Sequence, residues 1–301
     1  MPANLKDLET KDRPNWCPGC GDFGIQMALK QAIVNLGLEK ENVVISTGIG
    51  CGSKVNQWIE TYGFAGLHGR SIPVAMGIAL ANPELTVIDV GGDGDGYGIG
   101  MGHFINTMRR NLNITYIVQN NQTYGLTLGQ TSPTSEKGMV GPSTPKGVIE
   151  EPVNPIRLAL SSECTFVARG FSGDVPHLTK LIEAAIKHKG FALIDTFQPC
   201  VTFNKMNTYD FFRKRVYKLE DEAGYDVRDI NEAFKRAGEW GDKIPIGIFY
   251  QVERPTYEDS ELGLRKGNPV KADISKIDVN EVMQGWMGCG LFWWILLILD
   301  T

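Results

Sequence analysis

The stretch that decides the fold is Leu85-Thr-Val-Ile-Asp-Val90, followed at once by Gly91-Gly-Asp-Gly-Asp-Gly-Tyr-Gly-Ile-Gly100. The first part is a short apolar run with β-branched residues that stops at glycine, and this pattern predicts a buried strand. The glycine turn leads into residues 101–109, whose pattern is helical. A strand, a glycine-rich turn and a helix in this order indicate an α/β protein that binds a ligand beyond the end of the strand.

The same pattern recurs on both sides of this stretch. Further strands are expected at 43–46, 114–118 and 191–197, and helices at 24–36, 72–80 and 177–188. This alternation predicts an α/β fold with a doubly wound, mostly parallel sheet. In such sheets ligands bind at the carboxyl ends of the strands, where this sequence has its glycine clusters.

We divide the chain into an α/β domain, residues 1–200, and a C-terminal arm, residues 201–301. The sequence becomes charged and aromatic after residue 200, and we expect the arm to pack on the domain and on a partner subunit. Residues 131–154 are rich in proline and glycine, which indicates a long functional loop. The apolar run 291–299 is about half of the ~20 residues that span a bilayer, so we expect it to be buried against the domain or a partner.

Composition narrows the class of function. The chain has 301 residues with 35 acidic and 30 basic side chains, a net charge of −5. This balance argues against a nucleic-acid partner and favours a small-molecule enzyme. Residues 1–13 contain no apolar segment, so no secretory signal is expected and the predicted location is the cytoplasm.

The glycine turn carries a carboxylate, Asp93, directly after the strand. Glycines let backbone amides approach a phosphate, the helix N-terminus favours an anion, and a carboxylate can hold a divalent cation against it. The turn lacks the Gly-Lys-Ser/Thr of a P-loop, and nicotinamide-binding turns carry no such acid. We therefore expect a diphosphate and a metal ion here, with a merely flexible glycine turn as the alternative.

Six cysteines occur, at positions 17, 20, 51, 164, 200 and 289. Cys17 and Cys20 form a CxxC motif, and Cys51 and Cys200 each follow a predicted strand, so these four thiols are expected at one edge of the sheet. The spacing alone leaves open an iron-sulfur cluster, a zinc site, a redox disulfide or coincidence. Cys164 is interpreted as a buried small apolar residue, and no role is assigned to Cys289.

Taken together, these motifs resemble the β subunit of 2-oxoacid:ferredoxin oxidoreductases, a family of thiamine-dependent iron-sulfur enzymes that includes pyruvate:ferredoxin oxidoreductase. The matching elements appear in the family's order over roughly residues 12–220. They are Trp16-Cys-Pro-Gly-Cys-Gly-Asp22, Gly48-Ile-Gly-Cys-Gly-Ser-Lys54, Leu67-His-Gly-Arg-Ser-Ile-Pro73, Gly92-Asp-Gly-Asp95, Asn120-Asn-Gln-Thr-Tyr-Gly-Leu-Thr-Leu-Gly-Gln130 and Gln198-Pro-Cys200.

The resemblance implies a fold of the thiamine-diphosphate-binding type and assigns roles to individual residues. It implies that Cys17, Cys20, Cys51 and Cys200 bind a 4Fe-4S cluster. It further implies that Asp93, Asn121 and the Thr123 carbonyl hold Mg²⁺ on thiamine diphosphate. The residues expected near that cofactor are Gly50, Gly52, Ser53, His68, Gly92, Gly94, Asp95, Asn120 and Thr123.

Two residues are expected at the substrate. Lys54 follows the third cluster cysteine on the same loop, where a cation suits the carboxylate of a 2-oxoacid. Leu126 matches a family position that faces the substrate, and an apolar side chain there favours a broad range of 2-oxoacids.

By the same resemblance, the reaction is the coenzyme A-dependent oxidative decarboxylation of a 2-oxoacid to acyl-CoA and CO₂, with electrons passed through the cluster to ferredoxin. The glutamate that activates the cofactor comes from a partner α subunit, or a fused γ-α chain, and Glu60 does not match it. This chain is therefore expected to be inactive alone.

Two alternatives stay open. One is a non-redox thiamine-dependent lyase or synthase of the acetolactate type, in which the cysteines are structural. The other is a zinc-stabilised interaction subunit that has no organic cofactor of its own.

Overall fold

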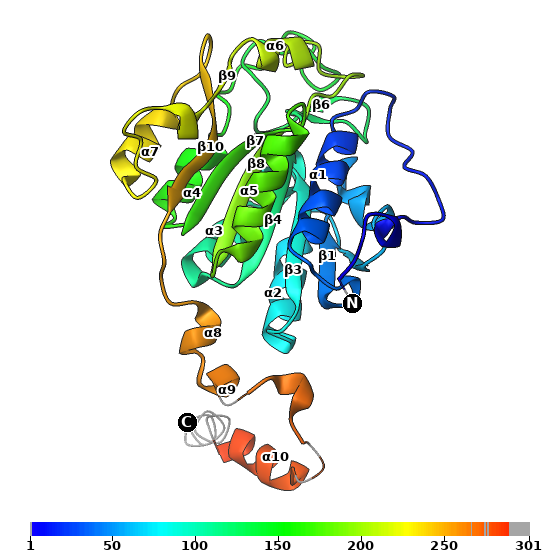
Figure 1. Ribbon diagram of the computed structural model, residues 1–301, viewed down its shortest axis with the longest axis vertical. Helices are drawn as coiled ribbons and strands as arrows, with labels where there is room; N and C mark the ends of the chain where they lie inside the picture. Colours follow the sequence, from blue (N-terminus) through cyan, green and yellow to red (C-terminus); the bar gives the residue numbers. More distant parts are fainter. Residues whose placement is uncertain (1, 266, 274, 276, 289–301) are drawn as a thin grey trace, which may run out of the picture.

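An eight-stranded sheet forms the centre of the computed structural model, which describes residues 2–265, 267–273, 275 and 277–288 (Figure 1). The strand order is β2-β1-β3-β4-β8-β7-β10-β9. All neighbouring strands pair in parallel except β10 and β7, which are antiparallel. The predicted α/β fold with a mostly parallel sheet is therefore confirmed. The strands are β1 (Val43–Thr47), β2 (Tyr62–Ala65), β3 (Thr86–Gly92), β4 (Ile114–Asn120), β7 (Phe166–Phe171), β8 (Phe191–Phe197), β9 (Val216–Lys218) and β10 (Ile244–Gln251).

Helices cover both faces of the sheet. One face carries α1 (Asp22–Asn35) and α5 (Val175–Lys187), and the other carries α2 (Ser71–Ala81), α3 (Met101–Arg110) and α4 (Pro155–Ser161). A separate two-stranded ribbon, β5 (Thr123–Tyr124) with β6 (Gln130–Thr131), follows β4. The remaining helices are α6 (Tyr209–Arg213), α7 (Ile230–Arg236), α8 (Tyr257–Ser260), α9 (Leu262–Arg265) and α10 (Val279–Gly288).

The central strands separate two apolar cores. In β4, Tyr116 and Val118 pack into the core under α2 and α3, whereas Ile117 packs into the core under α1 and α5. Successive side chains of a strand point to opposite faces, so a strand buried on both faces is apolar throughout. This explains why the predicted strands are continuous apolar runs rather than alternating ones.

Parallel pairing brings the ends of four strands to one edge of the sheet. Thr47 at the end of β1 pairs with Val90 of β3, and Gly92 pairs with Gln119 of β4. Asn120, the last residue of β4, pairs with Phe197, the last residue of β8. The glycine turn, the asparagine pair and two of the cysteine loops therefore begin next to one another.

The expected boundary at residue 200 falls inside the sheet. Strands β9 and β10 belong to residues 201–301, yet they extend the sheet beyond β7. β10 pairs antiparallel with β7, and β9 pairs in parallel with β10 to form the edge of the sheet, with α7 between the two strands in the chain. The part of the chain that leaves the sheet begins after Gln251, and α8, α9 and α10 extend away from the sheet (Figure 1).

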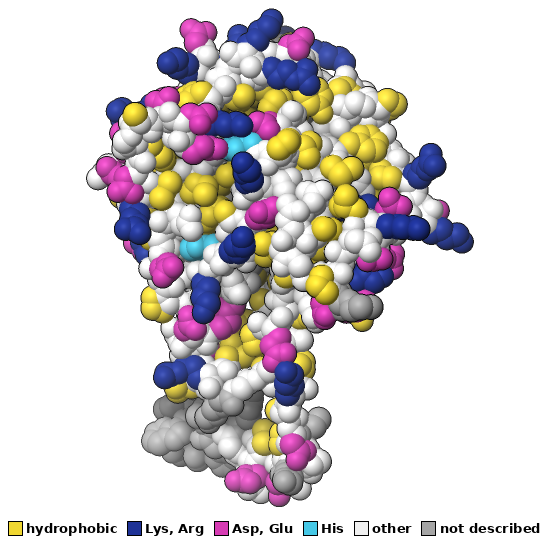
Figure 2. All heavy atoms as spheres, viewed as in Figure 1, with side chains coloured by type: hydrophobic (Ala, Val, Ile, Leu, Met, Phe, Trp, Pro, Cys, Tyr) yellow, Lys and Arg dark blue, Asp and Glu magenta, His cyan; other side chains and the backbone are white. Residues whose placement is uncertain are grey.

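Two expectations concern the surface and the C-terminus. Among the described residues, no helix has the length and apolar character to cross a membrane. The apolar run 291–299 lies outside the described residues. On the face drawn in Figure 2, acidic and basic side chains are interspersed between exposed hydrophobic ones.

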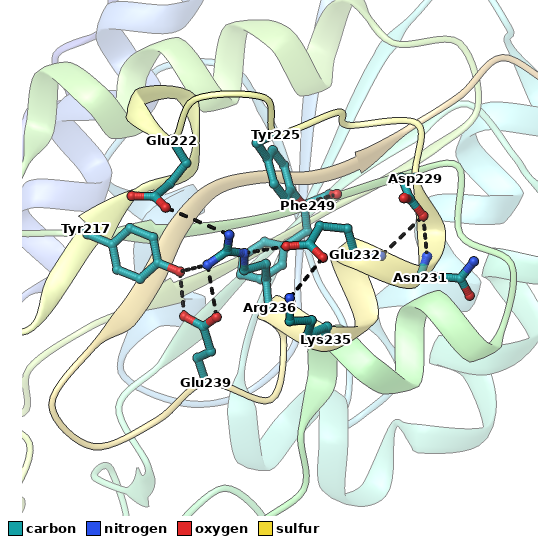
Figure 3. Close-up of polar contacts among 10 residues, drawn as sticks. All are labelled: Tyr217, Glu222, Tyr225, Asp229, Asn231, Glu232, Lys235, Arg236, Glu239 and Phe249. Atoms are coloured by element: carbon teal, nitrogen blue, oxygen red, sulfur yellow. Dashed lines mark hydrogen bonds and ion pairs between the residues drawn. The ribbon is translucent and has the colours of Figure 1, made fainter.

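A cluster of charged residues holds α7 against the outer strand of the sheet (Figure 3). The Arg236 guanidinium donates to Glu232 at 2.8 Å and to Glu239 at 3.1 Å, and it also donates to the Tyr217 hydroxyl at 3.3 Å. Burial and the hydrogen bond to Glu239 raise the pKa of Tyr217 to about 12. Arg236 thus joins α7 to β9 and to the turn that precedes β10.

Replacing Arg236 by methionine keeps the aliphatic stem but leaves the carboxylates around it without a cation. We expect a loss of about 1 kcal/mol in the free energy of unfolding, because a part-exposed network is worth less than a buried one. Lys235→Met is the matched control, since Lys235 is exposed and reaches only Glu232, at 3.4 Å. Urea titration followed by circular dichroism compares the two, and equal midpoints would show that the network does not hold α7.

Candidate functional site

Asp93 lies at the end of β3, where the strand passes into a π-helical turn, Gly94–Ile99. Its carboxyl group is buried, and burial raises its pKa to about 6. The Thr134 hydroxyl lies 2.6 Å from Asp93 Oδ2 and 3.0 Å from Asn120 Oδ1. A hydroxyl has one proton, so Thr134 donates to one of these oxygens at a time.

A pocket, here called the glycine pocket, opens beside Asp93. A Cβ atom added at Gly92 would meet nothing within 4 Å, so the pocket is open at that point. Ten of the residues expected at the cofactor or substrate line it, namely Gly50, Gly52, His68, Gly92, Asp93, Gly94, Asp95, Asn121, Thr123 and Leu126.

Asp95 organises the loops around this pocket. Its Oδ1 accepts hydrogen bonds from the backbone amides of Ile49, at 3.0 Å, and Gly69, at 2.7 Å. The same oxygen lies 3.0 Å from His68 Nδ1. Burial raises the pKa of this carboxyl group, whereas the backbone hydrogen bonds and His68 lower it. Asp95 therefore joins the loop after β1 to the loop before α2 and orients His68 at the pocket.

Tyr124 forms the wall opposite the glycine turn. Its hydroxyl donates to the Gly94 carbonyl at 3.2 Å, and a Cβ atom at Gly94 would collide with its ring. Close packing against Tyr124 therefore requires glycine at this position.

Two residues expected at the cofactor do not line the pocket. Asn120 points into a buried network in which its amide donates to Asp195 Oδ1 at 3.0 Å. Tyr97 donates to the same oxygen at 3.0 Å, and Arg169 pairs with the other carboxylate oxygen at 3.5 Å. Ser53 lies in the 3-10 turn after Cys51, buried, and its hydroxyl has no partner among the described residues. Asn120 thus lies outside the pocket lining and contacts it through Thr134, which also bonds to Asp93.

The four cysteines expected to act together line a second pocket, here called the cysteine pocket. Cys17, Cys20, Cys51 and Cys200 all face it, and all four thiols are free. The Trp16 indole donates to the Cys51 carbonyl at 2.7 Å and holds the N-terminal motif against the loop after β1. The sheet therefore gathers cysteines that lie far apart in the sequence.

Burial favours the neutral thiol form of two of these cysteines, Cys20 and Cys51. Burial raises the pKa of Cys51 to about 11, and it raises the pKa of Cys20 further. The Asp22 carboxylate contributes to both shifts, and its Oδ2 lies 3.3 Å from Cys20 Sγ. Thiolate ligation here would need the positive charge of a metal centre.

The two pockets share one wall, made by Cys51, Asn121, Gly125 and Leu126. A Cβ atom at Gly125 would lie 3.4 Å from Cys51 Sγ and 3.8 Å from Cys200 Sγ. Only a thin partition thus separates a ligand in the glycine pocket from one in the cysteine pocket.

Lys54 also lines the cysteine pocket, on the 3-10 turn Gly52–Gln57. Its ammonium group lies 3.4 Å from Asn15 Oδ1, which leaves most of its hydrogen-bonding capacity free for a ligand. Cys164 is fully buried, as predicted, and its Sγ lies 3.2 Å from the Phe166 carbonyl. Cys289 lies outside the described residues.

Two residues at these pockets were not expected from the sequence. Thr134 comes from the long loop 131–154 and hydrogen-bonds to Asp93. The proline and glycine content of this loop indicated a functional segment, but it did not show which side chain would reach the site. Gln198 is the first residue of the motif Gln198-Pro-Cys200, in which the glutamine was given no role, and its amide donates to Cys20 Sγ at 3.0 Å. Its position two residues before Cys200 was the one sequence feature that pointed to a place near the cysteines.

Comparison with known families gives two matches. Residues 48–196 match the family described as thiamine pyrophosphate enzyme, C-terminal TPP binding domain. Residues 200–266 match the family described as the C-terminal part of the pyruvate ferredoxin oxidoreductase beta subunit. The second match begins at Cys200 and includes β9 and β10.

Individual relatives agree with these matches. The chain is 52% identical to a 2-oxoacid:ferredoxin oxidoreductase subunit beta from Sulfolobus sp, over 81% of this chain and 84% of the relative. It is 46% identical to the 2-oxoglutarate oxidoreductase subunit KorB of Mycobacterium tuberculosis, over 86% of this chain and 81% of that relative.

A solved structure is also similar. It is described as 2-oxoglutarate:ferredoxin oxidoreductase from Magnetococcus marinus with 2-oxoglutarate, coenzyme A and succinyl-CoA bound. The TM-score is 0.86 at 36% identity, and the match covers 94% of this chain and 95% of that one. With this fold, these two pockets and these relatives, the chain belongs to the family of 2-oxoacid:ferredoxin oxidoreductase beta subunits.

Proposed function

We propose that this subunit binds thiamine diphosphate with Mg²⁺ in the glycine pocket and a 4Fe-4S cluster in the cysteine pocket. With its α subunit it would oxidatively decarboxylate a 2-oxoacid, transfer the acyl group to coenzyme A, release CO₂ and reduce ferredoxin. The observation that carries this proposal is the shared wall of Cys51, Asn121, Gly125 and Leu126, because electrons released in one pocket then travel a short way to the other.

The donor set of the glycine pocket fits a diphosphate with a divalent cation. Asp93 and Asn121 offer oxygen ligands of the kind that Mg²⁺ prefers, and the Thr123 carbonyl offers another. Asn121 Oδ1 accepts from the Thr123 amide at 3.0 Å, which fixes the amide group beside Asp93. The open space at Gly92 leaves room for phosphate oxygens.

The lining of the cysteine pocket suits a cofactor with four cysteine ligands. Structural zinc needs its thiolates about 2.3 Å from one point. Within the described residues, no group of three or more His, Cys, Asp or Glu side chains could hold a single metal ion. Four free cysteines around one pocket nevertheless suit a larger cofactor with a cysteine at each iron.

The chain's own residues then have distinct tasks. When bound, thiamine diphosphate supplies the decarboxylation chemistry and the cluster takes up electrons singly. Asp93 holds the metal, His68 faces the pocket from its contact with Asp95, and Lys54 offers a cation to the substrate carboxylate. Leu126, which is 44% exposed, gives the shared wall an apolar surface beside the substrate.

An exposed apolar rim around the glycine pocket supports docking of the α subunit there. Ile49 and Leu126 line the pocket, and Leu67 and Leu128 lie on the loops next to it. Leu67 is 76% exposed and Leu128 is 70% exposed, which is unusual for leucines on neighbouring loops. The activating glutamate expected from the partner would arrive on the surface that covers this rim.

The substrate is proposed as a 2-oxoacid, with 2-oxoglutarate among those accepted. The Mycobacterium relative is named for 2-oxoglutarate, and the Magnetococcus structure is described with 2-oxoglutarate bound. The apolar Leu126 favours use of further 2-oxoacids.

Asp93→Ala removes the carboxylate that would hold the metal. In the α/β complex we expect loss of Mg²⁺-dependent thiamine diphosphate binding, measured by isothermal titration calorimetry, with unchanged iron content. Asp210→Ala is the control, because Asp210 is exposed and is not part of the pocket lining. Unchanged affinity in the Asp93 variant would remove the assignment of the glycine pocket.

Cys17→Ser tests the cysteine pocket. After anaerobic purification of the complex, we expect about four irons per wild-type β chain, as a 4Fe-4S cluster contains, and loss of the brown chromophore in the variant. Cys164→Ala should keep the iron, because that thiol is buried elsewhere. Thiamine diphosphate without iron in the wild type would favour the lyase, and zinc without either would favour the interaction subunit.

Lys54→Ala should raise KM for the 2-oxoacid roughly 10-fold or more, since a hydrogen bond to a charged group is worth about 1.5–3 kcal/mol. KM for coenzyme A should change little in a viologen-reduction assay. Lys205→Ala is the control, because the Lys205 ammonium donates a hydrogen bond to the Val201 carbonyl at 2.5 Å. An equal rise in both constants would indicate a general structural role for Lys54.

A further inference from the structure

The Gln198 side chain makes an unusual contact in the cysteine pocket. It is 1% exposed, and its Nε2 lies 3.0 Å from Cys20 Sγ. Among the side chains that the structure describes, Gln198 alone donates a hydrogen bond to one of the four sulfurs; a backbone amide, that of Phe203, lies 3.5 Å from Cys200 Sγ. A buried amide placed on a sulfur is a polar interaction that packing alone does not require.

The backbone holds this amide in place from both sides. The Gln198 N–H donates to the Asn120 carbonyl at 3.0 Å, and the Gly21 N–H donates to the Pro199 carbonyl at 3.3 Å. A Cβ atom at Gly21 would lie 2.8 Å from Gln198 Cγ. Glycine at position 21 therefore lets the Gln198 side chain reach the Cys20 sulfur. A larger residue there would push the glutamine away.

A metal-bound sulfur determines which end of the amide faces it. A cysteine ligand is a thiolate, which only accepts hydrogen bonds. The amide must then present its NH₂ group, in the orientation that the structure has. A second polar group also contacts this sulfur: the buried Asp22 carboxyl group, whose Oδ2 lies 3.3 Å from Cys20 Sγ. Cys20 Sγ therefore contacts both the Gln198 amide and the Asp22 carboxyl group.

We propose that Gln198 is a positioning residue that raises the reduction potential of the cluster through its hydrogen bond to Cys20 Sγ. The inference rests on the proposed function, because it needs the cluster. In the proposed reaction the substrate gives up one electron as it is oxidised, and uptake of this electron would make the cluster and its sulfurs more negative. A hydrogen-bond donor at a sulfur stabilises this more negative form, and so favours the uptake of that electron.

The test compares Gln198→Met and Gln198→Glu with the wild-type α/β complex. The first removes the donor at similar volume, and the second places a carboxyl group at the sulfur. We expect the midpoint potential in an EPR-monitored redox titration to shift to more negative values in both variants, further in Gln198→Glu. The iron content should remain at the wild-type level.

Gln26→Met is the matched control. Gln26 is a buried glutamine on α1 whose amide donates to the Trp58 carbonyl at 2.7 Å rather than to a sulfur. Its loss should lower stability without moving the potential. An unchanged midpoint in iron-loaded Gln198→Met, or an equal shift in Gln26→Met, would overturn the inference.

A second measurement does not depend on the variants folding. Wild-type complex labelled with ¹⁵N at glutamine side chains should give a hyperfine coupling to the reduced cluster in pulsed EPR, and absence of this coupling would contradict the contact. Absence of iron in the wild-type complex would instead count against the proposed function itself.

Discussion

The structure depends on the parallel pairing of β1, β3, β4 and β8. Each strand contributes only a short turn or loop to the site, but hydrogen-bonded pairing forces the four carboxyl ends to one edge. The carboxylate, amide and thiol groups that follow these strands are polar, and they are gathered where the sheet ends and the apolar cores stop. The gathering of these polar groups at one edge is therefore a direct result of the parallel strand pairing.

Features that follow from short-range pattern were predictable. The apolar runs that end in glycine or asparagine predicted the central strands. The CxxC motif and the places of Cys51 and Cys200 after predicted strands predicted four thiols at one edge. These succeed because a strand buried on both faces leaves a continuous apolar signal and because parallel topology determines where its end lies. The resemblance added roles to the glycine turn that spacing alone left open.

Features that depend on long-range contact were not predictable. Strands β9 and β10 were not expected from the sequence, because β9 has only three residues and β10 pairs antiparallel with β7. Asn120 was expected at a ligand, yet Asp195 draws its amide into a network that no local pattern reveals. Thr134 reaches Asp93 from a loop with little periodicity. In each case the partner lies far away in sequence, so propensity contains no information about it.

The positions of the four thiols have a consequence for how the protein is made. Cys17 and Cys20 precede the first helix, whereas Cys200 follows β8, so the complete set of ligands exists only after the central sheet has assembled. Contacts of such long range form late, because closing a large loop costs entropy before it returns any stabilisation. A metal centre held by all four thiols, as proposed above, could thus be inserted only into a nearly finished molecule. Such a centre would link residues that precede α1 to residues that follow β8, and would therefore tie together the first and last parts of the central sheet to form.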